Sequence, residues 1–188
     1  MTFMKGLNRF GVTLNGAGGS GAFAVAHTFD GTTSSYTFAV PQDIPLLQFE
    51  MVVQSERLTG TSSILGVRFN GDTGSNYRNQ RADAHGTSVA GLNNGVLSYG
   101  RIAIGNDAVN LFPTSIYCAV PFHTNSDFPK ITHVEANVVI GGTSNDNYTL
   151  LYSHWWNDTS PITSVTVHEA NGDNFVSGSR LIAYGDLR

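Results

Sequence analysis

Hydrophobic and polar residues alternate with a period of two along most of this chain, and helical spacing is almost absent. Turn-forming groups such as Asn70-Gly-Asp, Asn93-Asn-Gly and Asn171-Gly-Asp separate the alternating segments. Short strands at this spacing predict an all-β protein, an antiparallel β-sandwich or jelly roll. The pattern predicts strands at Ala22–Phe29, Tyr36–Val40, Leu47–Ser55, Ser63–Phe69, Val96–Ile104, Ile116–Phe122, Ile131–Ile140, Tyr148–Trp156, Ile162–Glu169 and Arg180–Tyr184.

The last part of this pattern leaves one question open. Both faces of the strand at Ile162–Glu169 are mixed in sequence, so the pattern does not show which face is buried. After the turn at Asn171-Gly-Asp, we expect Phe175 to fill a place in the core. Gly178 and Ser179 would then turn the chain into the last strand.

Residues 1–21 differ from the rest and predict a short N-terminal arm with a Gly-rich linker, followed by a single domain at residues 22–188. Two interpretations of the arm stay open: a mobile terminus, or a segment that pairs with a neighbouring subunit. Apolar residues that a free tail would not need favour the second, and they are candidate interface residues: Phe3, Met4, Leu7, Phe10, Val12 and Leu14.

Composition excludes several classes of protein. No window approaches the length of a membrane-spanning apolar segment, and we expect no signal peptide because the N-terminus has no apolar core region. The single cysteine, Cys118, excludes an internal disulfide and a cysteine-based zinc cluster, and we expect it in the core. With a net charge of −4 and only two lysines, no basic stripe indicates direct binding of nucleic acid.

No motif in the sequence indicates catalysis, a metal or a cofactor. Gly16-Ala-Gly-Gly-Ser-Gly21 matches the dinucleotide fingerprint, but an alternating strand follows it where that site needs a helix. His133-Val-Glu135 lacks the thiolates of a zinc deaminase, which makes an ordinary surface pair the better interpretation. Asp72, among nearby asparagines, offers oxygen ligands for calcium, although turn chemistry explains it better. We therefore expect a protein that is not an enzyme.

His154-Trp155-Trp156 is the most informative aromatic cluster. On a strand the two indoles point to opposite faces, so one of them enters the core while the other is left for solvent, a sugar ring or another protein. Trp155 and Trp156 are both candidate interface residues, because aromatic anchors are typical of protein contacts.

Two stretches of the sequence resemble the β-rich virion proteins of tailed bacteriophages. These are Arg68-Phe-Asn-Gly-Asp-Thr-Gly-Ser-Asn-Tyr77 and the closing segment from Pro161 to Gly185, which has the form Ile-Thr-Ser-Val, then Gly-Asp-Asn-Phe-Val-Ser-Gly-Ser, then Tyr-Gly. The resemblance implies a phage structural protein and does not fix its place in the virion.

We expect from this resemblance a capsid decoration, or cement, protein. It would be made in the cytoplasm of the host bacterium, bind the major capsid protein on the outside of the head, and self-associate, as a homotrimer. The short chain and the apolar arm favour this role over a long fibre. The alternative is a receptor- or glycan-binding module of a tail or head fibre, which the paired tryptophans favour. A glycan hydrolase on a β-sandwich is the third possibility.

Overall fold

The computed structural model of the chain describes residues 22–56, 63–105, 113–139 and 147–186. The predicted arm, with Phe3, Met4, Leu7, Phe10, Val12 and Leu14, lies outside the described residues. The described residues contain twelve strands: β1 (Ala22–Thr28), β2 (Ser35–Ala39), β3 (Leu46–Val53), β4 (Ser63–Phe69), β5 (Tyr77–His85), β6 (Ser88–Leu97), β7 (Gly100–Gly105), β8 (Thr114–Pro121), β9 (Lys130–Val139), β10 (Asn147–Trp156), β11 (Ser164–Glu169) and β12 (Arg180–Asp186). In these ranges, no helix is long and apolar enough to cross a membrane.

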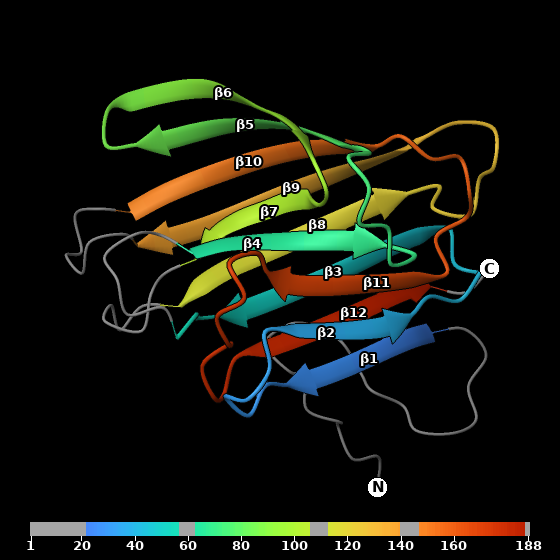
Figure 1. Cartoon of the computed structure of the whole chain (residues 1–188), viewed down its shortest axis with the longest axis horizontal. Coiled ribbons are helices and arrows are strands. Elements are labelled where there is room, and N and C mark those ends of the chain that lie inside the picture. Colours follow the sequence, from blue (N-terminus) through green and yellow to red (C-terminus); the bar gives the residue numbers. More distant parts are fainter. Residues whose placement is uncertain (1–21, 57–62, 106–112, 140–146, 187–188) are drawn as a thin grey trace, which may run out of the picture.

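The strands form two antiparallel sheets that pack face to face (Figure 1). The large sheet has eight strands in the order β1-β12-β3-β8-β9-β10-β5-β6, and the small sheet has four in the order β2-β11-β4-β7. The predicted all-β sandwich is therefore confirmed. Because the large sheet is twice as wide, β5 and β6 extend past the edge of the small sheet (Figure 1).

The core lies between the two sheets, where alternate side chains of each strand meet. β9 and β10 alternate closely: over most of each strand, every second residue is buried and the residues between are exposed. Val165 and Val167 of β11 are fully buried, which settles the face that the sequence left open. Phe175 is also fully buried and pairs with Ser55 in an isolated bridge, so the prediction that it enters the core is confirmed.

Two turns predicted from the sequence are built as their residues suggest. Asn70 and Gly71 both have positive φ, 53° and 69°, in the turn after β4. Gly172, with φ of 88°, follows β11, and the Glu169 carboxylate accepts hydrogen bonds from the backbone of Asn171 and Asp173. The turn chemistry thus holds a buried carboxylate in place.

One predicted strand is wrong, and two observed strands, β5 and most of β6, were missed. The segment predicted as a strand at Val96–Ile104 belongs to β6 and β7, which lie in different sheets. The Asn79 side chain fixes the segment that passes from β6 in the large sheet to β7 in the small sheet. Its amide donates to the Tyr99 carbonyl and accepts from the Arg101 backbone N–H at 2.6 Å. β5 was missed because its inward positions after Tyr77 are polar or charged, with Asn79, Arg81 and Asp83, so the strand shows no alternating apolar face.

Cys118 lies in the middle of β8 with no exposed surface, as expected. Burial raises the pKa of the Cys118 thiol well above its ordinary value. A protonated, inaccessible thiol of this kind is inert.

Candidate functional site

The two adjacent tryptophans point to opposite faces of β10, as the sequence predicts. Trp156 is 1% exposed, and its indole nitrogen donates to Asp72 Oδ2 at 2.6 Å. Its ring stacks near that of Tyr77, with centroids 6.4 Å apart. The prediction of Trp156 as an interface residue is therefore wrong. Its ring is buried in the core and its indole N–H is bonded to Asp72, so no part of it is left for a partner. Trp155 is 45% exposed and remains a candidate.

The Asp72 carboxylate holds together the turn that follows β4. Besides Trp156, its carboxylate accepts hydrogen bonds from the Asn76 amide and the Gly74 backbone. Burial by itself would raise the pKa of Asp72, but these donors outweigh it and lower the pKa. Within the ranges that the structure describes, no group of three or more His, Cys, Asp or Glu could hold a metal ion.

Large exposed apolar side chains gather on one sheet. All of those in the described residues lie on the large sheet or on the loop between β8 and β9: Val52, Val89, Leu92, Val96, Phe122, Phe128, Ile131, Leu151 and Trp155. The small sheet presents Thr37 and Thr166 to solvent, hydrogen-bonded to each other. The two outward surfaces of the sandwich therefore differ in polarity.

Strand register places five of these apolar residues on one surface, which we call the outer face: the solvent side of β9, β10, β5 and β6. Val89 of β6 lies at one end of it, beside Ala84. Trp155 of β10 lies between Ile131 of β9 and Arg78 of β5. Arg78 in turn lies beside Val96 of β6. Further along β10, Leu151 lies between Glu135 and Ala82 on the same side.

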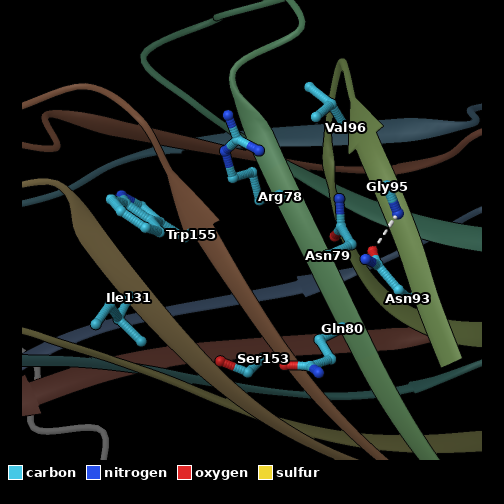
Figure 2. A pocket seen from close by; sticks show the side chains of 9 residues that line it. All are labelled: Arg78, Asn79, Gln80, Asn93, Gly95, Val96, Ile131, Ser153 and Trp155. Carbon is cyan, nitrogen blue, oxygen red and sulfur yellow. Dashed lines mark hydrogen bonds between the residues drawn. The ribbon is translucent and has the colours of Figure 1, made fainter. Parts of the chain in front are cut away.

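A shallow hollow of about 550 Å³, the Trp155 hollow, opens on the outer face (Figure 2). It is lined by Arg78, Asn79, Gln80, Asn93, Gly95, Val96, Ile131, Ser153 and Trp155. In Figure 2 the Trp155 ring and the Arg78 guanidinium lie side by side at one end, while Gln80 and Ser153 lie at the other. This volume is in the range of small-ligand sites.

Several polar groups in the Trp155 hollow are available to a ligand. Arg78, Gln80 and Ser153 make no side-chain hydrogen bond with any part of the chain that the structure describes. Asn93 uses its carbonyl oxygen to accept from Gly95 N at 2.8 Å, which leaves its amide hydrogens unused (Figure 2). Asn79, by contrast, is buried, and its side chain is hydrogen-bonded to the backbone of Tyr99 and Arg101.

A second hollow, of about 410 Å³, adjoins the first along β10, and Gln80 and Ser153 line both. We call it the Glu135 hollow, because it also contains Glu135 with His133 and Leu151. His133 and Glu135 are exposed on one face of β9, the surface pair that the sequence suggested. We refer to the two hollows together as the groove along β10.

The sequence identified Trp155 and missed its neighbours. Arg78, Gln80 and Asn93 come from β5 and β6, which the hydrophobic pattern did not predict in full. The alternation of Arg78 and Gln80 with the inward Tyr77 and Asn79 was the only available signal. Arg78 lies beside Trp155 because β5 pairs with β10, a strand far from it in the chain. Periodicity within one strand does not reveal such a pairing.

Comparison with known proteins assigns no family. No family model and no curated protein matches the chain. Among solved structures, alginate lyase Aly36B is similar over 88% of this chain and 79% of its own, with 14% identity and a TM-score of 0.33. A double mutant of the same lyase, in complex with alginate trisaccharide, is similar over 89% of this chain and 82% of its own, with 11% identity and a TM-score of 0.32.

The tripod from the baseplate of bacteriophage Tuc2009 is similar over 100% of this chain and 79% of its own, with 11% identity and a TM-score of 0.29. These likenesses are too distant to indicate a function or a ligand. The chain is a β-sandwich protein with weak structural similarity to a phage baseplate protein and to alginate lyases.

Proposed function

We propose that this chain is a non-enzymatic capsid decoration protein of a tailed phage, which attaches to the major capsid protein through the outer face. One observation carries the proposal: the large exposed apolar residues of the described chain lie on the large sheet and its β8–β9 loop, and the small sheet has none. Exposed apolar patches of this kind are typical of protein contact sites. The resemblance of the closing segment to phage virion proteins supplies the setting.

The outer face has the composition of a protein interface. Trp and Arg are among the residues most often found at the energetic centre of a contact, and Trp155 and Arg78 are direct neighbours. Leu151 and Ile131 provide apolar area around them, each about half exposed. A specific contact buries about 1,200–2,000 Å² in total, and repetition over many capsid sites adds to the stability of the shell.

The test is attachment to expanded heads that lack the protein, measured by co-sedimentation. Leu151→Asp places a charge in the middle of the outer face and is expected to weaken attachment at least tenfold. Ala39→Asp, an exposed change on β2 of the small sheet, is the matched control and should attach as the unchanged protein does. Failure of the unchanged protein to attach, or equal loss in both variants, would overturn the proposal.

Self-association belongs to the same proposal. The expected homotrimer would repeat the contact around a capsid symmetry axis, so that weak single contacts add up. Mass measurement of the isolated full chain by light scattering tests it directly. If the protein is a monomer at the concentrations used for attachment, the proposed homotrimer is wrong, and the proposal of attachment is not affected.

A second candidate function is a receptor- or glycan-binding module of a tail or head fibre. The observation that favours it is the Trp155 hollow, where an exposed indole adjoins side chains with unused hydrogen-bonding groups. A sugar presents apolar C–H faces and a ring of hydroxyl groups, and this hollow offers a partner for each. Glycan binding that Trp155→Ala abolishes would establish this function over the first.

A further inference from the structure

We propose that the Trp155 hollow binds a saccharide whose terminal ring carries a single carboxylate, and that Arg78 recognises this acid. The inference rests on the second candidate function, glycan binding, and names its ligand class. It is carried by the side chains that line the hollow and by their charges.

Trp155 provides the surface for the sugar ring. Its indole is 45% exposed on a regular strand, and the strand pairing on both sides fixes its position. A flat aromatic ring on a rigid strand loses little conformational freedom on binding. Ile131 and Val96, 49% and 47% exposed, add apolar surface at the sides of the hollow. Such a platform covers the apolar face of a pyranose.

The polar side chains of the hollow suit sugar hydroxyl groups. Gln80 and Ser153 each offer both a donor and an acceptor, and Asn93 offers donors from its amide nitrogen. A protein partner would have to pair each of these groups to avoid leaving a desolvated polar atom. Sugar hydroxyls, which both donate and accept, satisfy them with little geometric demand. The donor set therefore favours a saccharide in this hollow.

The charge distribution selects an acid at one end. Among the residues that the structure describes, Arg78 is the only charged one that lines the Trp155 hollow, although the chain has a net charge of −4. Its guanidinium has no ion-pair partner in the part of the chain that the structure describes. A guanidinium binds a carboxylate through two parallel hydrogen bonds, which are stronger than bonds between neutral groups. An acidic terminal ring stacked on Trp155 would place its carboxylate beside Arg78.

The adjoining hollow limits the acid to one ring. Glu135 lies in the Glu135 hollow, where a saccharide extending along β10 would place its next residues. Arg81 also lines this hollow, but its guanidinium is already paired with Asp83 at 2.6 Å. A second carboxylate there would therefore meet the like charge of Glu135, which is unfavourable. The groove thus suits a chain with one acidic terminus and neutral rings behind it, and it disfavours a polyuronate.

Matched disaccharides provide the test. The probes are β1,4-linked gluco-, galacto- and manno-configured disaccharides, each in two forms: a neutral hexose or the corresponding uronic acid at the non-reducing end. Binding to the full chain is measured by calorimetry at low ionic strength. We expect at least one acidic form to bind about tenfold more tightly than its neutral match. The preference should shrink as salt is added, because the site is open to solvent.

Three variants locate the effect. Arg78→Gln should abolish the preference for the acid and leave binding of the neutral match unchanged, whereas Trp155→Ala should abolish both. Arg180→Gln is the matched control: Arg180 is an exposed arginine on β12 of the same sheet, separated from β5 by four strands. It should change nothing. Trigalacturonate should bind no more tightly than the neutral disaccharides.

The outcomes separate this inference from the function on which it rests. Equal binding of acidic and neutral forms, or a preference that survives Arg78→Gln, would overturn the inference and leave glycan binding intact. Tighter binding of trigalacturonate would overturn the limit to one acid. If no probe bound at millimolar concentration to protein shown to be folded, the inference and the second candidate function would both fall, and attachment to heads would be unaffected.

Discussion

Buried histidines make stability depend on pH. His154 of β10 is 1% exposed, and burial lowers its pKa to about 3, although the Arg101 backbone acts in the opposite direction. Burial also lowers the pKa of His168 to about 4, and the nearby Arg68 adds to the effect. The pKa of His123 is lowered by burial as well. The folded protein therefore resists protonation at pH values where an unfolded histidine takes up a proton.

The first prediction is a loss of stability in mild acid. Below about pH 6.5 the unfolded chain binds more protons than the folded one, so the free energy of unfolding falls as pH falls, down to the folded-state pKa values. Between pH 7 and pH 5 we expect a loss of about 2 kcal/mol for each of His154 and His168, measured by urea denaturation. His154→Leu should remove roughly a third to a half of this dependence. A flat profile in the unchanged protein would contradict the assignment.

Phe122 is an exposed side chain on an unfavourable backbone. Its φ is 51°, in the left-handed region that costs a residue with a side chain roughly 1–2 kcal/mol, and the side chain is 61% exposed. Its backbone bonds, from its nitrogen to Pro45 O and from Asn125 N to its oxygen, do not need the ring. The fold therefore gains little from a phenylalanine here.

The second prediction follows from this geometry. Phe122→Asn should keep or raise the free energy of unfolding, by up to about 1 kcal/mol, because asparagine tolerates positive φ. Thermal unfolding of the variant measures the change. Phe128→Asn, an exposed ring in the same loop with ordinary φ, is the control and should bring no gain. A loss of more than about 1 kcal/mol in Phe122→Asn would show that the ring does stabilise the fold.

At the scale of elements, the start of β7 packs closely against β10 of the large sheet. Gly100 begins β7, and a Cβ built there would collide with the His154 ring of the large sheet. The absence of a side chain at Gly100 thus lets β7 approach β10. Gly91 of β6, by contrast, has open space around its Cβ position and no positive φ.

The third prediction compares these two glycines. Gly100→Ala should lower the free energy of unfolding by about 1–3 kcal/mol, because the core around His154 has to shift. Gly91→Ala should be neutral or raise it by about 0.5–1 kcal/mol, since alanine loses less backbone entropy than glycine in a strand. Chemical denaturation of both variants provides the measurement. Equal effects of the two changes would contradict the packing described at Gly100.

The same elements show what the sequence could predict. Strands with one face in the core, such as β9 and β10, alternate clearly. Their predicted ends lie within one residue of the observed ends. The β5–β6 hairpin extends past the small sheet, so only the start of β5, at Tyr77 and Asn79, has its inner side in the core, and the rest of the hairpin need not alternate. β6 has Val89 and Leu92 exposed on opposite sides. Periodicity carries no signal where burial is absent on both faces.

At the scale of the whole molecule, two sheets of unequal width produce an asymmetric body. The small sheet covers part of the large one, and the large sheet presents a polar-lined groove with Trp155 at one end. The sequence indicated that one tryptophan would be exposed, and it offered no way to choose between them, because the choice depends on which face of β10 meets the small sheet. The packing of the two sheets decides it: Trp156 meets Phe69 of β4, and Trp155 is left on the solvent side.

The burial of Cys118 has a practical consequence for locating this protein on a virus particle. The sequence has one cysteine, and its thiol is inaccessible, so the native chain should react with no maleimide. An engineered cysteine at the position of Leu151 or Ala39 would then be the sole point of attachment for a gold cluster or a fluorophore. Labelling before and after assembly would report which surface a virus particle shields, with no need to remove the native sulfur.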